Sequence, residues 1–297
     1  ICPQCNGLES IVIRHFVLMP ATPPTAQDPS SQTIKQPLDC VEPAHNNSRG
    51  QLMSRLRILV LAPDTNPESI TGPLLSFHQA QALAQIHDVT LVIRSTVEGV
   101  VRQASASFRA IEVVPMPLLE RIHAWSFRWI FKSNYRSQAF TAFGYPFSIA
   151  FEWHAWRQLR SRILDDEFDV VLRLLPIVPV LPSLFAFFLR DGPIPFVIGP
   201  LNGGLPWPPG FSQADKQKEW ISGLRNLYRF LPFARATYNN AAAIVAGSSQ
   251  TYAEFVQHQE KVFFLPENGL TRSQCDSVRA PGRAHRLELS FVGALIP

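Results

Sequence analysis

The sequence predicts an α/β protein built on a doubly wound parallel sheet, and two observations lead to this fold class. From residue 57 onward, short apolar runs alternate with longer stretches of helical periodicity, which is the pattern of strands joined by crossover helices. The first run, Arg57–Ala62, is apolar without interruption after its first residue. Such a run is typical of a strand that is covered on both faces. We therefore expect a parallel sheet with helices on both sides.

Taken in order, the apolar runs predict seven strands. They lie at 57–62, 89–93, 110–114, 169–174, 195–199, 241–246 and 261–265. The intervening segments predict helices at 73–86, 118–135, 147–164 and 181–189, and a further one that begins after residue 248. Pro73 suits the first turn of its helix, where a missing N–H costs nothing. Leu75, Gln79, Ala82, Leu83 and Ile86 then lie at helical spacing.

The composition divides the chain into three parts. Residues 1–52 are rich in Pro, Ser, Thr, Gln and Asn and have no sustained period, and Met53 stands just before the first strand. We expect residues 1–52 to be a disordered extension or an artefact of translation. Residues 53–270 hold the predicted sheet. Residues 271–297 contain one more strand-like run, Leu287–Gly293, and are expected to be a linker and the first strand of a second lobe that is missing.

Composition and charge argue against several classes of protein. Hydrophobic residues make up 46% and charged residues 17% of the chain, so most of it is globular. The net charge of +4 comes without a block of Lys and Arg, which argues against nucleic acid as a partner. The cysteines are scattered, and the Cys2–Cys5 pair has no second pair at metal spacing, so we predict neither a metal site nor a disulfide framework. No run of 18 apolar residues occurs. We expect a cytoplasmic protein, with a peripheral position on the inner face of the membrane as the alternative.

Ligands of doubly wound sheets bind beyond the carboxyl ends of the strands, which directs attention to four loops. The first loop, 62–72, precedes a helix N-terminus whose backbone N–H groups suit an anion. Its one glycine, Gly72, either contacts a phosphate or permits a turn. The loop has no GxGxxG pattern, which disfavours a nicotinamide enzyme. We predict no cofactor.

The second loop, 199–210, is the most distinctive segment of the chain. Asn202, Gly203 and Gly204 permit positive φ and leave backbone N–H groups without side-chain cover. Trp207 and the prolines around it stiffen the loop. A rigid loop with an aromatic wall suits a sugar or a lipid-like acceptor. The alternative is a proline-braced connection that only covers the core.

The two remaining loops carry polar side chains with a local structural explanation as well as a functional one. Ser248 or Ser249 is expected to cap the helix that follows, and Ser248 is also a candidate ligand contact. Glu267, Asn268 and Gly269 form either a plain turn or, at a junction between lobes, the mouth of a cleft. No HExxH, GxSxG or P-loop pattern occurs, so the sequence does not predict a self-contained hydrolase.

Residues 121–136 combine basic and aromatic side chains. The basic members are Arg121, Arg128 and Lys132, and the aromatic members beside them are Trp125, Trp129, Phe131 and Tyr135. Basic residues flanked by interfacial aromatics suit a helix that lies on an anionic membrane. The alternative is a helix whose aromatic rings pack into the domain while its cations stay in solvent.

Several segments of the chain, taken in order, resemble landmarks of the family 4 glycosyltransferases of GT-B fold. They are the loop that carries Gly72, then Gln81–Val92, Ala243–Ser249, Pro266–Leu270 and Leu289–Gly293. The similarity covers residues 56–297. It implies an enzyme of two Rossmann-like lobes that transfers a sugar from a nucleotide-sugar with retention of anomeric configuration and without a bound metal. The N-terminal lobe, which holds the acceptor, corresponds to this chain.

Carried over by position, the resemblance places Gly72 near the donor diphosphate. It places Asn202, Gly203 and Gly204 on the acceptor side, and residues 267–269 at the hinge between the lobes. The chain departs from the family at two points. Thr71 precedes Gly72 where a pair of glycines is common, and Leu175 follows the fourth strand where many relatives have a histidine near the reacting sugar. We therefore assign no catalytic residue.

These observations lead to the hypothesis of an acceptor-binding lobe from a retaining hexosyltransferase, involved in the biosynthesis of a cell-surface or exported polysaccharide. Its partners would be a nucleotide-sugar and a glycan or lipid-linked acceptor. Because the donor-binding lobe is missing, we expect the chain alone to lack transferase activity. Two alternatives stay open. One is a non-catalytic binding or membrane-docking module, and the other is a nucleotide-sugar epimerase of GT-B fold, which needs an acid–base pair that the sequence does not display.

Overall fold

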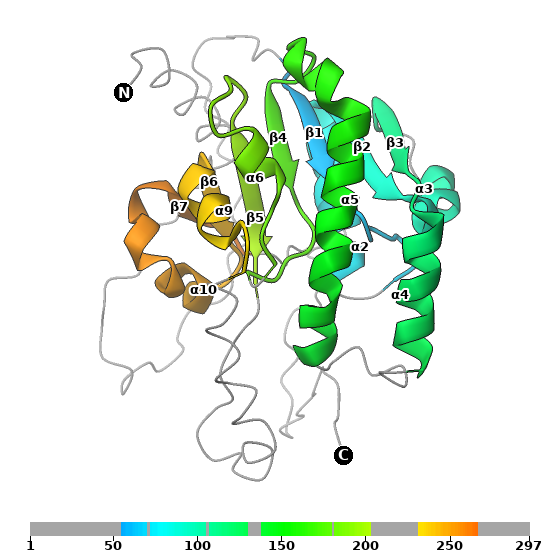
Figure 1. Cartoon of the computed structure of the whole chain (residues 1–297). Coiled ribbons are helices and arrows are strands. Elements are labelled where there is room, and N and C mark those ends of the chain that lie inside the picture. Colours follow the sequence, from blue (N-terminus) through cyan, green and yellow to red (C-terminus); the bar gives the residue numbers. More distant parts are fainter. Residues whose placement is uncertain are drawn as a thin grey trace, which may run out of the picture. The chain divides into compact units, whose positions relative to one another are not determined.

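The computed structural model describes residues 55–69, 72–104, 107–129, 138–179, 181–202 and 231–266. Within these ranges a single sheet of seven strands has the order β3-β2-β1-β4-β5-β6-β7. The strands are β1 (Arg57–Leu61), β2 (Asp88–Arg94), β3 (Ala110–Val114), β4 (Val170–Arg173), β5 (Phe196–Leu201), β6 (Ala243–Ala246) and β7 (Val262–Phe264). Every neighbouring pair is parallel. All seven predicted strands are therefore confirmed, within a few residues at their ends (Figure 1).

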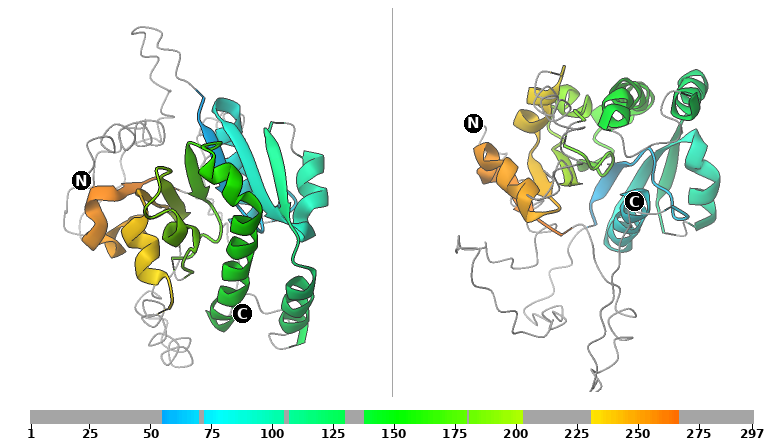
Figure 2. Two further views of the ribbon diagram at one scale, coloured as in Figure 1. Left: turned by 45° about the horizontal axis from the view of Figure 1, so that its top comes forward. Right: turned by 90° about the horizontal axis from the view of Figure 1, so that it is seen from below.

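Helices cover both faces of this sheet, which confirms the doubly wound fold class. They are α2 (Gly72–Ile86), α3 (Glu98–Ala104), α4 (Pro117–Trp129), α5 (Gln138–Leu164), α6 (Phe185–Phe188), α9 (Ala234–Asn240) and α10 (Ser249–Glu254), with short 3₁₀ turns at Ser95–Val97 and Val256–Lys261. In Figure 2, right, α5 and α2 lie on opposite sides of the strands. Among the described helices, none is long and apolar enough to cross a membrane. The predictions for residues 1–52 and 271–297 fall outside the described residues.

The position of strand β1 between two core layers explains why its sequence is continuously apolar. Leu59 and Leu61 belong to the core layer that α5 covers, together with Phe151 and Leu159 of that helix. Ile58 and Val60 belong to the other layer, beneath α2 and α3. These four side chains are completely buried. A strand in the middle of a parallel sheet has no face for water, so alternation of polar and apolar residues is absent.

Helix α2 packs against the sheet through one aromatic ring and several small residues. Phe77, Ala80 and Ala84 pack against the sheet, whereas Ile86 is exposed. Ser76 is also buried, and its hydroxyl donates to Thr65 Oγ1 at 3.0 Å and lies 2.9 Å from the Pro73 carbonyl. Small residues let the helix approach the strands closely, and the hydroxyl pair satisfies the polar groups on that side. Leu83 also packs against this core layer while remaining partly exposed, and the helix predicted at 73–86 is confirmed.

A glycine in strand β5 has no room for a side chain. Gly199 has φ +124°, and a Cβ placed there would lie 2.3 Å from the carbonyl oxygen of Val245 on the adjacent strand. The pairing of β5 with β6 shifts register between Ile198 and Leu201. This irregularity marks a β-bulge, which is a common position for glycine because the backbone leaves the ordinary strand conformation. The bulge lies at the carboxyl end of β5, where the second candidate loop begins.

Residue 199 is therefore expected to tolerate only glycine. Gly199→Ala should lower the free energy of unfolding by about 3 kcal/mol, because the new methyl group collides with backbone and the φ angle is unfavourable. The matched control is Gly99→Ala in α3, where no atom lies within 4 Å of the new Cβ and helix propensity predicts a gain of about 0.5–1 kcal/mol. Urea denaturation followed by circular dichroism measures both. Equal stability of the two variants would contradict this account of the bulge.

An ion pair joins the beginnings of β1 and β4. The carboxylate of Asp169 accepts hydrogen bonds from Arg57 Nη2 at 2.6 Å, from Arg57 Nε at 3.2 Å and from the Arg57 backbone N–H at 2.7 Å. Burial alone raises the pKa of Asp169, but the hydrogen bonds and the charge of Arg57 outweigh it and hold the pKa below its ordinary value. The ionised carboxylate is thus bound more tightly in the folded chain than in the unfolded one.

The stabilisation from this pair should disappear in acid. A carboxyl group with a lowered pKa in the folded state contributes stability above its unfolded pKa of about 4, and the contribution is lost as the pH falls through the folded pKa. Wild type and Asp169→Asn should therefore differ in urea midpoint at pH 7 and converge towards about pH 3. Asp191→Asn, at an exposed carboxylate, is the control and should stay close to wild type at pH 7. A constant difference between wild type and Asp169→Asn at every pH would disprove the assignment.

Candidate functional site

The candidate site lies where the order of the strands reverses. Strands β1 and β4 are neighbours in the sheet, yet the chain leaves β1 towards β2 on one side and leaves β4 towards β5 on the other. Ligands of open α/β sheets bind in the crevice beyond the carboxyl ends of two such strands. The two loops that leave this point are residues 62–71 and 174–184.

These two loops are packed against each other at Gly72. A Cβ placed on Gly72 would lie 3.3 Å from Cδ1 of Ile177, which belongs to the loop after β4. The carbonyl of Ile177 in turn accepts a hydrogen bond from the backbone N–H of Asn202 at 2.8 Å. Two of the predicted site residues, Gly72 and Asn202, thus both contact Ile177. Gly72 does not have positive φ, so the close approach of Ile177, rather than a turn, favours glycine here.

Ser248 performs the structural role expected of it. Its Oγ accepts a hydrogen bond from the backbone N–H of Thr251 at 3.2 Å and caps the N-terminus of α10. The preceding residue, Gly247, donates to the Leu201 carbonyl at 2.7 Å, which ties this loop to the end of β5. The prediction of a cap at Ser248 is confirmed, and its contact with a ligand stays a prediction. The other candidate residues, Gly203, Gly204, Trp207, Glu267, Asn268 and Gly269, lie outside the described residues.

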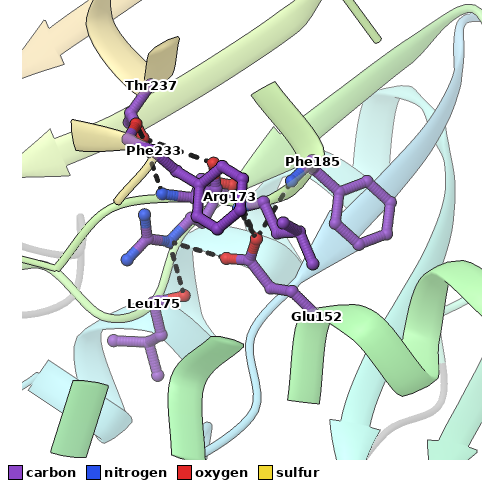
Figure 3. Close-up of polar contacts among 8 residues, drawn as sticks. Glu152, Arg173, Leu175, Phe185, Phe233 and Thr237 are labelled. Atoms are coloured by element: carbon purple, nitrogen blue, oxygen red, sulfur yellow. Dashed lines mark hydrogen bonds and ion pairs between the residues drawn. The ribbon is translucent and has the colours of Figure 1, made fainter. Parts of the chain in front are cut away.

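A buried ion pair at the end of β4 was not predicted from the sequence. Arg173 is the last residue of β4, and Glu152 comes from the middle of α5. Their side chains are 0% and 2% exposed, and Arg173 Nε lies 3.5 Å from Glu152 Oε1 (Figure 3). The same Nε donates to the Leu175 carbonyl at 3.3 Å. The pair therefore connects the strand to the helix that covers it and to the loop that follows it.

The second carboxylate oxygen of Glu152 holds the start of α6. Glu152 Oε2 accepts from Ser183 Oγ at 2.8 Å and from the backbone N–H groups of Leu184 at 2.6 Å and Phe185 at 3.1 Å. The first N–H groups of a helix have no partner within it, and a carboxylate satisfies them well. Thr237 of α9 holds the same loop from the other side, since its Oγ1 accepts from the Ser183 N–H at 2.7 Å. The loop after β4 is thus fixed between two helices.

The outer end of Arg173 has unused hydrogen-bonding capacity. Nη1 and Nη2 are buried and have no hydrogen-bond partner in the part of the chain that the structure describes, and Figure 3 shows them pointing away from Glu152. Burial lowers the pKa of Arg173, while the negative charge of Glu152 opposes that shift. An arginine keeps its charge in proteins, so these N–H groups are a strong donor pair for the oxygens of a carboxylate or a phosphate.

A second charged cluster lies beyond the ends of β1 and β2. Arg94, at the end of β2, forms an ion pair with Asp64 in the loop after β1. Next to it, Ser95 Oγ lies 2.8 Å and 2.9 Å from the two carboxylate oxygens of Glu120 on α4. Burial lowers the pKa of His123, and the positive charge of Arg94 lowers it further, so the imidazole is held neutral at pH 7. The described ranges contain no group of three or more His, Cys, Asp and Glu side chains that is placed to hold a metal ion.

The sequence contained a signal for one of these missed residues. Arg173 is the one charge in an otherwise apolar stretch from Leu172 to Leu189, and a charge at the end of a buried strand requires a partner. Its partner could not be identified in the same way, because Glu152 lies in a helix among several other charged residues and 21 positions earlier in the chain.

Comparison with known proteins gives a likeness in fold only. No protein-family model matches the chain, and no curated protein matches it. Among solved structures, the Arabidopsis thaliana UGT89C1 complexed with UDP-L-rhamnose is 12% identical, with a TM-score of 0.38 over 74% of this chain and 54% of the other. The N-terminal domain of Candida albicans trehalose-6-phosphate phosphatase is 15% identical, with a TM-score of 0.38 over 72% and 45%. This chain thus spans about half the length of the structures that it matches.

The buried pair should be energetically coupled. Arg173→Met leaves a buried carboxylate without its cation, and Glu152→Gln leaves a buried cation without its carboxylate, so each should lower the free energy of unfolding by about 3–5 kcal/mol. The double variant should lose at least about 1 kcal/mol less than the sum of the two losses. Arg190→Met, at an exposed ion pair with Asp191, is the control and should change stability by less than about 1 kcal/mol. Urea denaturation measures all four, and strictly additive losses would show that the pair is not coupled.

Proposed function

We propose that this chain is the acceptor-binding lobe of a retaining glycosyltransferase of GT-B fold and family 4, of the hexosyltransferase type. The whole enzyme transfers a sugar from a nucleotide-sugar to a glycan or lipid-linked acceptor in polysaccharide biosynthesis. The observation that carries the proposal is the packing at the reversal of strand order, where Gly72, Ile177 and Asn202 bring the loops after β1, β4 and β5 together. This is the position at which a doubly wound sheet binds its ligand.

The charges around that point suit a substrate that carries phosphate. Arg173 has buried N–H groups without a partner at the end of β4, and Arg94 lies at the end of β2. The N-terminus of α2 begins at Gly72 and adds backbone N–H groups with a favourable dipole. Guanidinium groups and helix N-termini are the usual ligands of a diphosphate. We propose that they bind the donor diphosphate or a phosphate on the acceptor.

The remaining roles belong to the same proposal. Asn202, Gly203, Gly204 and Trp207 line the acceptor side, Ser248 contributes a hydroxyl at the neighbouring strand end, and residues 267–269 form the hinge. Catalysis in such a site comes mainly from aligning the acceptor hydroxyl with the anomeric carbon and from stabilising the departing nucleoside diphosphate. The reaction uses the nucleotide-sugar as a substrate and no resident metal.

The test is sugar transfer by the natural gene product that carries these residues. The protein is incubated with UDP-, GDP- and ADP-sugars and with glycan or lipid-linked acceptors, release of the nucleoside diphosphate is followed, and NMR establishes the anomeric configuration of the product. We expect transfer with retention. Products of inverted configuration, or no transfer with any donor, would overturn the proposal.

A substitution at Gly72, where the order of the strands reverses, tests whether the activity belongs to this site. Gly72→Ala adds a methyl group 3.3 Å from Ile177, which displaces the loop after β4 by a few tenths of an ångström. We expect kcat/KM to fall about tenfold, which corresponds to about 1.4 kcal/mol of transition-state stabilisation. Gly99→Ala in the exposed helix α3 is the matched control and should keep full activity. Full activity in Gly72→Ala would place the substrate elsewhere.

A further inference from the structure

Helix α4 carries an exposed apolar stripe. Four of the seven large hydrophobic residues that are exposed in the described part of the chain belong to this helix: Leu118 (69% exposed), Ile122 (43%), Trp125 (57%) and Trp129 (66%). Their spacing of four, three and four residues puts them on one side of a helix. Two solvent-exposed tryptophans within one apolar stripe are unusual, and such a patch commonly marks a surface that binds a partner or a membrane.

The opposite side of α4 is fixed to the domain, so the stripe has a defined direction. Leu119 packs against the core layer that contains α5, and Ser126 is buried. The ring of His123 lies 4.8 Å from that of Phe147 on α5, and Glu120 accepts a hydrogen bond from Ser95. The helix therefore cannot turn its tryptophans inward without breaking these contacts. The alternative in which the aromatic rings of this segment pack into the domain is wrong for Trp125 and Trp129.

The charges next to the stripe identify the kind of surface that fits it. Arg121 and Arg128 are exposed and lie seven residues apart, along one edge of the stripe. The acidic residue of the helix, Glu120, is turned towards Ser95 and away from them. The sequence continues beyond the helix with Lys132 and Arg136. Tryptophan, leucine and isoleucine bordered by cations are typical of helices that lie in the interface of an anionic bilayer, with the aliphatic parts of arginine reaching along the apolar surface.

We propose that α4 is a membrane-docking helix, which inserts Leu118, Ile122, Trp125 and Trp129 among the lipids of an anionic bilayer while Arg121 and Arg128 bind headgroup phosphates. The helix lies in the plane of the interface and does not cross the bilayer. Its 13 residues cover about 20 Å of membrane surface. This inference goes beyond the proposed function, because the docking surface would serve any activity that the lobe supports.

Vesicle binding of the full chain tests the docking surface. The protein is sedimented with vesicles of phosphatidylcholine alone or of phosphatidylcholine with about one third phosphatidylglycerol. We expect at least tenfold stronger partition onto the anionic vesicles, weakening as salt screens the headgroups. A blue shift of tryptophan fluorescence should accompany binding, because the indole rings leave water.

Variants separate the stripe from the rest of the chain. The double variant Trp125→Ala, Trp129→Ala should lower the partition coefficient at least tenfold, and Arg121→Gln with Arg128→Gln should lower it about fivefold for each arginine. Trp153→Ala, at a half-exposed tryptophan on α5, and Arg190→Gln are the matched controls and should bind as wild type. Circular dichroism confirms that each variant is folded.

Three results would overturn the proposal. They are equal binding to neutral and anionic vesicles, wild-type binding by the double tryptophan variant, and a concentration-dependent dimer that buries the stripe with no vesicle binding. The assay contains no nucleotide-sugar and no acceptor. Failure of the docking proposal can therefore be distinguished from failure of the proposed transferase activity.

Discussion

The carboxylate of Glu152 is a buried charge on which the geometry around the end of β4 depends. One oxygen faces the guanidinium of Arg173, and the other accepts hydrogen bonds from three groups at the start of α6. Helix α5, strand β4 and the loop after β4 are thus held by one side chain. That loop carries Ile177, which lies between Gly72 and Asn202. A displacement of Glu152 would therefore be transmitted to the place where three loops of the candidate site meet.

Burying an ion pair of this kind costs the desolvation free energy of two charges, and apolar residues of similar size often stabilise a fold as well or better. General stability is thus a poor explanation for Glu152 and Arg173. The hydrogen bonds suggest a different one. The carboxylate replaces the missing partners of the first N–H groups of α6, which fixes where the loop before that helix runs. Arg173, restrained by the same carboxylate, is left with its outer N–H groups directed away from the pair. We infer that the pair orders a loop and orients a cation.

The strands could be predicted from the sequence because each is a short apolar run whose neighbours along the chain are polar or helical. The cap at Ser248 could also be predicted, since its partner Thr251 is three residues away. The burial of Ser76 in α2 could not, because it depends on the contact of its hydroxyl with that of Thr65 in the preceding loop. The partnership of Glu152 with Arg173 depends on how α5 crosses β4, which no local pattern contains.

At Gly72 the structure gives a packing reason for glycine that the sequence did not predict. The sequence singled it out as a phosphate contact or a turn, and the structure shows a third explanation, the close approach of Ile177 from the loop after β4. Long-range packing of this kind leaves no trace in the local sequence. The exposure of Trp125 and Trp129 is a similar case, since the sequence left open whether their rings pack into the domain or face outward.

The two proposals constrain each other through the position of α4. Its first turn follows the end of β3, and Glu120 binds Ser95, the residue after β2. Figure 1 shows α4 and the first half of α5 extending past the carboxyl edge of the sheet. A bilayer in contact with the stripe would therefore lie close to the edge where Arg94 and Arg173 stand, and where an acceptor would bind. An acceptor anchored in that bilayer could reach the site without leaving the membrane, and its phosphate would meet the cations there. Under the two proposals together, a lipid-linked acceptor would gain from the proximity of the membrane and a free glycan would not.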